Sequence, residues 1–119
     1  MVEDNDGLRR LAKRLLEQAG YKVHCASSGN DALRVLATLK APVDLLLTDL
    51  VMPGMSGRHL AEAATASYPG MRVLYMSGYT SDGVIRRGVI AAESAFLDKP
   101  FTAAALLAKV REVLGPVRA

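Results

Sequence analysis

The sequence has little of what marks a secreted, membrane-spanning or nucleic-acid-binding chain. Its 119 residues include one cysteine, Cys25, so no internal disulfide can form and a reducing cytoplasm is the expected setting. No apolar run approaches the ~20 residues of a membrane helix, and none resembles a signal peptide. Tryptophan is absent and the formal net charge is only +3. We therefore expect no direct contact with nucleic acid or membrane.

What is present suits one globular domain spanning residues 1–119, since 50% of the residues are hydrophobic and 23% are charged. From Asp6 to Ala19 the apolar residues recur at spacings of three and four, which predicts a helix that ends at Gly20. Three further helices are predicted to begin at the N-cap residues Ser28, Ser56 and Thr102. Weaker periodicity predicts another helix over Ser81–Ala91.

Four segments between these helices have strand patterns. The segment "YKVHCA", Tyr21–Ala26, alternates apolar and polar residues, as a strand with one solvated face does. The segments "DLLLTD", "RVLYMS" and "SAFLDK" are short and continuously apolar up to their polar ends. Strands that alternate with helices and are apolar on both faces predict a parallel α/β sheet covered by helices on both sides.

Polar residues follow several of these segments where each strand ends. Glu3 and Asp4 follow Met1 and Val2, and the buried strands end in Asp49, Ser77 and Lys99. The carboxyl ends of parallel strands meet at one edge of a sheet, where ligands bind. Each residue alone could be a helix cap, but together they predict a common site.

The chemistry of such a cluster is restricted. Carboxylates a few ångströms apart repel one another unless a cation lies between them, and oxygen ligands suit Mg²⁺. Beside Mg²⁺ a carboxylate can attack phosphorus and form an acyl phosphate. Lys99 can neutralise the charge of the transferred group, and Ser77 can donate a hydrogen bond to it. The residues predict a phosphoryl acceptor.

These residues also resemble a known family. The pair Glu3 and Asp4, the segments "TDLVMPGMSG" and "MSGYT", and "DKPF" occur in the order and spacing of a response-regulator receiver domain. The resemblance implies that Asp49 receives a phosphoryl group from a phosphohistidine of a histidine kinase or phosphotransfer protein. It implies Mg²⁺, with Mn²⁺ as an alternative, bound by Asp4, Asp49, the Val51 backbone carbonyl and, through water, Glu3. It also implies a cis Lys99–Pro100 peptide bond.

The resemblance further implies a doubly wound, flavodoxin-like sheet of five parallel strands in the order 2-1-3-4-5, with helices on both faces. It supplies a switch in which Ser77 moves toward the phosphate and Phe96 follows. The face made by the fourth helix, fifth strand and fifth helix then changes partners. Packing of Phe96 as an ordinary core residue is the alternative.

The segments "RVLYMSGYT", "FLDKPF" and "LLAKVREVLG" resemble the corresponding segments of receivers at the C-terminus of hybrid sensor histidine kinases. Receivers begin with an apolar strand of about five residues, whereas only Met1 and Val2 precede the acidic pair here. We expect a truncated first strand, and either a frayed second strand or its repair by another chain. A dimer through the incomplete sheet, or through the switch face, is the corresponding expectation.

Two alternatives remain at this stage. An aspartyl-phosphate phosphatase of the haloacid-dehalogenase type also places a nucleophilic Asp after an apolar strand, but it requires a second Asp where this chain has Val51. A receiver-shaped interaction module without phosphorylation is the second alternative, because of the short first strand. In the favoured interpretation the chain is a phosphoacceptor that dephosphorylates itself and is no turnover enzyme.

Overall fold

This computed structural model describes residues 1–39, 43–52, 54–77 and 95–115, which contain four helices and three strands. The elements are α1 Asp6–Gln18, α2 Gly29–Thr38, β1 Leu45–Asp49, α3 Gly57–Ser67, β2 Arg72–Ser77, β3 Ala95–Asp98 and α5 Ala103–Leu114. The helix predicted over Ser81–Ala91 lies outside the described residues. Among the helices of these ranges, none is long and apolar enough to cross a bilayer.

Each of the helices begins at a side-chain cap. The side-chain oxygens of Asn5, Ser28, Ser56 and Thr102 each accept a hydrogen bond from the backbone N–H three residues further on. Such caps satisfy N–H groups that have no partner inside the helix. The helix starts predicted at Ser28, Ser56 and Thr102 are confirmed.

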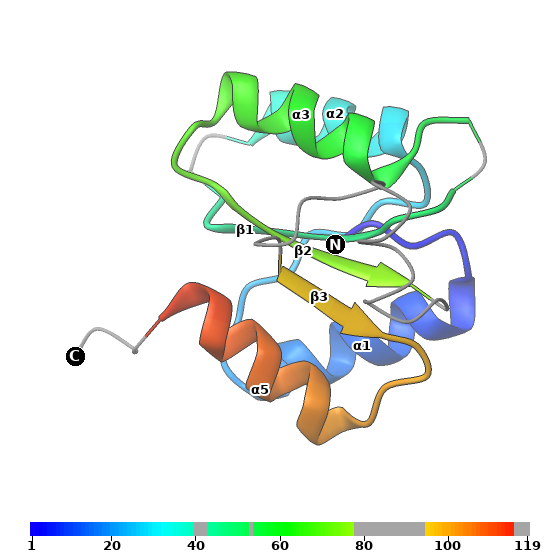
Figure 1. Ribbon diagram of the computed structural model, residues 1–119, viewed down its shortest axis with the longest axis vertical. Helices are drawn as coiled ribbons and strands as arrows, with labels where there is room; N and C mark the ends of the chain where they lie inside the picture. The colour runs from blue at the N-terminus through cyan, green and yellow to red at the C-terminus, as the bar shows by residue number, and fades with distance from the viewer. Residues whose placement is uncertain (40–42, 53, 78–94, 116–119) are drawn as a thin grey trace.

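The three strands form a parallel sheet in the order β1-β2-β3, with helices on both faces (Figure 1). Residues of α2 and α3 pack in one apolar cluster and residues of α1 and α5 in the other. Leu46 of β1 belongs to the first cluster and Leu47 to the second, because successive side chains of a strand point to opposite faces. The predicted α/β class is confirmed.

The first two predicted strands are reduced to isolated bridges at Val2, so the sheet of the described residues has three strands and not the predicted five. Val2 pairs in parallel with Ala26 on one side and Thr48 on the other. The segment thus lies between Ala26 and β1, where the first strand was predicted. Tyr21–Cys25 forms no strand, because the neighbouring segment is too short to pair with it. The strand predicted over Tyr21–Ala26 is wrong, and the expected fraying is observed.

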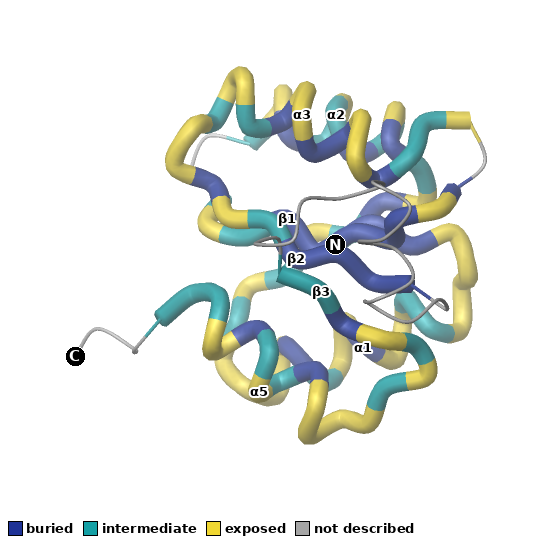
Figure 2. Tube along the Cα trace, in the orientation of Figure 1, coloured by how far each residue is buried: buried dark blue, intermediate teal, exposed yellow. Residues whose placement is uncertain are grey.

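The register of the sheet brings its polar residues to one edge. Asp49 at the end of β1 lies opposite Met76 of β2, and Ser77 lies opposite Asp98 of β3. Among the described residues, the buried polar or charged ones are Glu3, Thr48, Asp49 and Ser77. Figure 2 shows that the buried parts of the chain gather along the strands and on the inner sides of the helices, whereas the outer faces of the helices are exposed.

Candidate functional site

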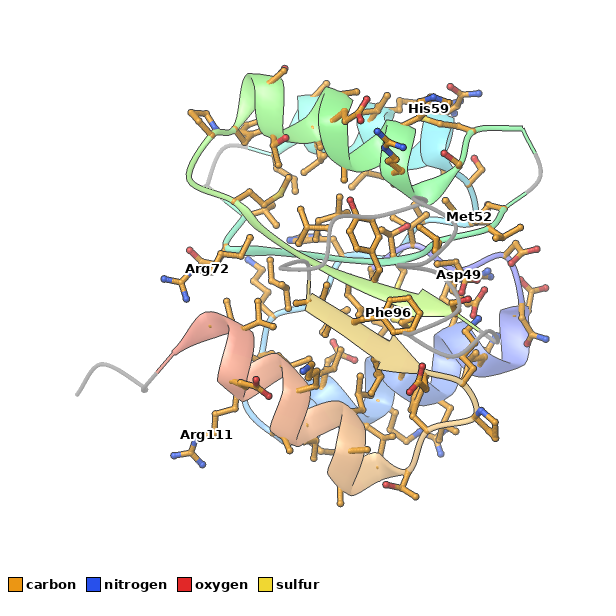
Figure 3. The ribbon with its side chains drawn as sticks, in the orientation of Figure 1. Asp49, Met52, His59, Arg72, Phe96 and Arg111 are labelled. Atoms are coloured by element: carbon orange, nitrogen blue, oxygen red, sulfur yellow. The ribbon has the colours of Figure 1, made fainter. Side chains whose placement is uncertain are left out.

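Three carboxylates converge where β1 ends. One carboxylate oxygen from each of Glu3, Asp4 and Asp49 lies within 4.8 Å of the other two. Two hydrogen bonds hold the N-terminal segment beside β1: the Val2 N–H donates to Leu47 O at 2.7 Å, and the Asp49 N–H donates to Val2 O at 3.1 Å. The short bridge at Val2 therefore positions the acidic pair against Asp49, which Figure 3 labels.

Lys99 completes the cluster from the loop after β3. Its Nζ lies 2.5 Å from Glu3 Oε1 and also forms an ion pair with Asp49 Oδ1. The Lys99 backbone N–H donates to Ser77 O at 2.7 Å, which fixes the loop to the end of β2. The Lys99–Pro100 peptide bond is cis, as the resemblance implied. The structure thus brings together Glu3, Asp4, Asp49 and Lys99, as the sequence predicted.

The protonation of Asp49 is shifted by its surroundings. Burial raises the pKa of its carboxyl to about 7, the contact with Glu3 adds to the rise, and the Lys99 ammonium opposes it. A protonated carboxyl is a poor nucleophile. A divalent cation among the carboxylates would favour the ionised form of Asp49.

The pKa values of Glu3 and Lys99 move in the directions that favour an ion pair. Burial alone would raise the pKa of Glu3, but its hydrogen bonds with Asp49, Lys99 and Asp4 outweigh burial and lower the pKa to about 2. Burial alone would lower the pKa of Lys99, but its hydrogen bonds with Asp49 and Glu3 outweigh burial and raise that pKa. These shifts favour an ion pair between Glu3 and Lys99, and the Glu3 and Asp49 carboxyls titrate as a coupled pair.

The loop after Asp49 is packed against the start of α3 through a contact that only glycine allows. The Gly57 N–H donates to Leu50 O at 2.9 Å, and a Cβ at Gly57 would lie 2.0 Å from the Asp49 carbonyl oxygen. Sequence reasoning gave Gly57 no role. The signal was its place directly after the N-cap Ser56, within the quoted segment "TDLVMPGMSG".

Two further residues near the acidic pair were also missed. Arg9 of α1 donates from Nη1 to the Glu3 carbonyl oxygen at 2.8 Å and forms an ion pair with Asp6. The Asn5 N–H donates to Glu3 Oε2 at 3.3 Å. Both contacts hold the acidic pair in place. The sequence shows Arg9 only as one of several basic residues on a helix, so it offered no specific signal.

The remaining predicted residues have simpler surroundings. Ser77 is buried at the end of β2, one residue after Met76, which pairs with Asp49. Phe96 of β3, labelled in Figure 3, is half-buried and packs against the apolar cluster that contains residues of α2 and α3. Val51 is 66% exposed. Gly78 to Thr80 of "MSGYT" lie outside the described residues.

The residues of the cluster fit a divalent metal ion. The donors are carboxylate oxygens, two of them on the buried residues Glu3 and Asp49 and one on the exposed Asp4. Oxygen donors that lie partly open to solvent suit Mg²⁺, which keeps several water ligands. The exposed side at Asp4 leaves access for such waters and for a second molecule.

The family comparison agrees with the site. The family described as the response regulator receiver domain matches residues 1–111. The chain belongs to the response regulator receiver family. As a receiver, it is similar to the sensor kinase CckA of Brucella abortus, with 37% identity over 114 residues that cover 96% of this chain and 12% of that kinase. It is also similar to the receiver protein CpdR of Brucella abortus, at 32% identity, with 96% of this chain and 93% of that protein covered.

Solved receiver structures have the same fold. The crystal structure of the receiver domain of the hybrid histidine kinase CckA matches with a TM-score of 0.80 and 32% identity, covering 96% of this chain and 95% of that chain. The chemotaxis response regulator CheY4 of Vibrio cholerae matches with a TM-score of 0.81 and 29% identity, covering 94% and 93%. The receiver chain thus spans about an eighth of the Brucella kinase (12%) and nearly all of the separate receiver protein.

Proposed function

We propose that this receiver domain accepts a phosphoryl group on Asp49 from the phosphohistidine of a histidine kinase or a histidine phosphotransfer protein. The observation that carries the proposal is the convergence of three carboxylates and one ammonium at the carboxyl edge of the sheet. Asp4 is exposed beside the buried Asp49, so a donor can approach from that side.

The chemistry assigns one role to each side chain. Asp49 Oδ attacks phosphorus, the P–N bond breaks, and its electron pair returns to the donor imidazole. The Lys99 ammonium, now in contact with Asp49, stabilises negative charge on the phosphoryl oxygens. Ser77 donates a hydrogen bond from its hydroxyl to one of these oxygens. Water later hydrolyses the acyl phosphate, so one domain undergoes both steps without being a turnover enzyme.

Mg²⁺, or Mn²⁺ in its place, is the proposed cofactor. Asp4, Asp49 and the Val51 backbone carbonyl would hold the ion directly, and Glu3 would hold it through a water molecule. When bound, the ion would neutralise charge on the phosphoryl oxygens and favour the ionised form of Asp49. Glu3 is buried and already paired with Lys99, which supports an outer position for its carboxylate.

The proposed switch joins the site to a protein-interaction face. When Ser77 approaches the phosphoryl group, Phe96 moves toward the space beside it, and the surface formed by β3 and α5 changes. Half-burial of Phe96 in register with Tyr75 supports this role, since a partly exposed ring has room to move. The fourth helix of the predicted face lies outside the described residues.

The similarity to a hybrid-kinase receiver supports a place in a phosphorelay. We propose that residues 1–119 act as one receiver domain on the cytoplasmic side of a signalling pathway, either as part of a hybrid histidine kinase or beside one. In that role the domain relays, stores or removes phosphoryl groups from its kinase, without binding nucleic acid or membrane itself.

Incubation with acetyl phosphate and Mg²⁺ tests the proposed function. Mass spectrometry is expected to find one added phosphoryl group on Asp49 that hydroxylamine removes. The variant D49N should carry none, whereas D44N, which changes an exposed carboxylate, should be modified normally. An unmodified wild-type chain would favour the inert interaction module, and turnover of added phosphomonoesters would favour a phosphatase.

A further inference from the structure

Met55 anchors the loop that follows Asp49 to the rest of the fold. It is half-buried and packs against the apolar cluster that contains residues of α2 and α3. Gly54, directly before it, has a φ of +82°, in the left-handed region that favours glycine, so the backbone turns there. Met52 is buried in the same cluster on the other side of this turn. Packing of the two methionines therefore holds the loop.

The seat of Met55 is Gly29, the buried first residue of α2. A Cβ at Gly29 would lie 2.8 Å from Met55 Sδ and 2.9 Å from Met55 Cβ. Among the described glycines, positive φ values occur at Gly20, Gly54 and Gly115, so the backbone conformation does not require glycine at position 29. The close packing does, because Met55 Cβ is attached to the loop backbone and cannot move away without it.

The segment Ala26–Gly29 supports both parts of the proposed metal site. At its start, Ala26 O accepts a hydrogen bond from the Glu3 N–H at 3.1 Å. At its end, Gly29 carries Met55. The acidic pair and the loop after β1 lie far apart in the sequence, but they rest on the same short segment.

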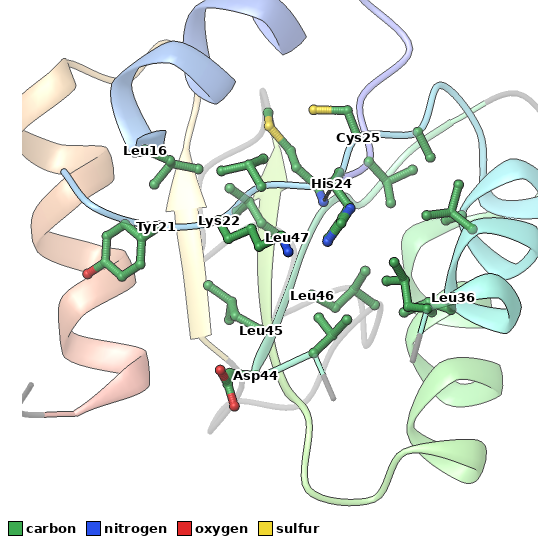
Figure 4. A pocket seen from close by; sticks show the side chains of 18 of the residues that line it. Leu16, Tyr21, Lys22, His24, Cys25, Leu36, Asp44, Leu45, Leu46 and Leu47 are labelled. Carbon is green, nitrogen blue, oxygen red and sulfur yellow. Dashed lines mark hydrogen bonds between the residues drawn. The ribbon is translucent and has the colours of Figure 1, made fainter. Parts of the chain in front are cut away.

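The chain before this segment offers it little support. Tyr21–Ala26 forms one wall of an apolar groove of about 540 Å³ beside β1, and Val43–Leu47 forms the other wall (Figure 4). The first wall forms no strand and has one isolated bridge, at Ala26. The placement of Gly29 therefore depends on contacts further along the chain, namely the packing of α2 and the seated Met55.

We propose that Met55 is a positioning residue for the metal site. Seated on Gly29, it fixes the loop so that the Val51 carbonyl lies beside the acidic residues of the site. This role rests on the proposed function, in which that carbonyl is a metal ligand. Val51 is itself largely exposed, so its own side chain does not hold its backbone in place. Met55 supplies that hold and links the loop to the segment that also binds Glu3.

Titration with Mg²⁺ tests this role without a phosphoryl donor. We expect G29A to raise the dissociation constant for Mg²⁺ roughly tenfold, because the added methyl group displaces Met55 and with it the loop. G70A is the matched control, since a Cβ at Gly70 would meet no other described residue within 4 Å and should leave the constant unchanged. The amide NMR signals of Leu50 and Gly57 give the readout. Equal constants for G29A and the unaltered chain would overturn the proposal.

A double-mutant cycle assigns the effect to the contact itself. M55G removes the side chain, so it should also weaken Mg²⁺ binding roughly tenfold. In the M55G background the methyl group of G29A enters vacated space, and we expect it to change the dissociation constant by less than about twofold. If G29A costs as much in that background as in the unaltered chain, the loss comes from α2 alone and the proposal is overturned.

Phosphorylation at two Mg²⁺ concentrations separates positioning from a general loss of structure. M55G should accept phosphoryl groups from acetyl phosphate slowly at low Mg²⁺ and as fast as the unaltered chain at saturating Mg²⁺. A rate that stays low at saturation would overturn the positioning role. If the unaltered chain binds Mg²⁺ but is never phosphorylated, the proposed function fails, and the Mg²⁺ titrations still decide the role of Met55.

If G29A does not fold, M55L takes its place in the titration. Leucine has nearly the volume of methionine, so M55L should bind Mg²⁺ within about threefold of the unaltered chain, whereas M55G should bind it roughly tenfold more weakly. Melting curves without metal show whether each variant is folded. Equal binding by M55L, M55G and the unaltered chain would overturn the proposal.

Discussion

At the scale of single residues, Lys99 connects the two buried carboxylates of the site. Replacing it with alanine removes the positive charge that stabilises the transferred group, so we expect K99A to accept phosphoryl groups from acetyl phosphate at least about tenfold more slowly. Loss of this cation should also raise the pKa of Asp49 further, measurable by NMR titration. K109A removes a lysine of α5 that pairs only with Glu112 among the described residues, and it should leave both quantities unchanged.

The pKa of Asp49 sets a pH dependence of stability in the absence of metal. Its folded-state pKa of about 7 lies above the ordinary value of 3.8, so the folded chain binds this proton more tightly than the unfolded chain. The resulting stability is fully present below the ordinary pKa and is lost as the pH rises from about 4 to about 7. Glu3, with a pKa of about 2, contributes in the opposite sense. Its contribution to the stability of the fold is lost only as the pH falls below 4.5, the ordinary pKa of this carboxyl.

We therefore expect D49N to be more stable than the wild-type chain at pH 7 in EDTA, by an amount on the order of 1 kcal/mol. The difference should shrink as the pH is lowered toward 4, because the carboxyl of the folded wild-type chain is then protonated and no longer a buried charge. Thermal unfolding at a series of pH values measures this. A difference that stays constant between pH 4 and 7 would contradict a raised pKa of Asp49.

At the scale of elements, the start of α3 is pressed against the end of β1. A Cβ at Gly57 would lie 2.0 Å from the Asp49 carbonyl oxygen, and backbone cannot move away as a flexible side chain can. We expect G57A to cost roughly 1–3 kcal/mol of stability and to weaken Mg²⁺ binding, because the loop after Asp49 must shift. Chemical denaturation and metal titration test the two effects.

Gly7 provides the matched control on another helix. A Cβ there would meet only the Asn5 side chain, at an ordinary contact distance of 3.5 Å, and alanine favours a helix over glycine. G7A is therefore expected to leave stability unchanged or raise it slightly. Equal destabilisation by G7A and G57A would show that the close packing on Asp49 has no special cost.

At the scale of the whole molecule, metal binding and folding are linked. The Glu3, Asp4 and Asp49 carboxylates come together only in the folded chain, so Mg²⁺ should raise the melting temperature in proportion to the logarithm of its concentration. At 100 times the dissociation constant the gain would be about 2.7 kcal/mol. D4N should weaken the dependence and D44N should not. A melting temperature that does not change with Mg²⁺ concentration would contradict a metal site at these residues.

The sequence by itself determined the local features of this protein. Caps at Ser28, Ser56 and Thr102 begin helices because a side-chain oxygen satisfies a nearby N–H, which needs no distant partner. Continuous apolar runs became the strands β1, β2 and β3, and β1 and β2 are mostly buried because helices cover both sheet faces. Since parallel strands end at one edge, the meeting of Asp49 with Glu3, Asp4 and Lys99 followed from the same pattern.

Only the tertiary structure decided what depends on contacts between distant segments. The alternating pattern of Tyr21–Ala26 predicted a strand, but a strand forms only where a neighbour pairs with it, and Val2 offers a single bridge. The support of Glu3 by Arg9, the close approach of Gly57 to Asp49 and the raised pKa of Asp49 each depend on distances that no local pattern contains. The groove beside β1 is of the same kind, since its walls lie far apart in the sequence.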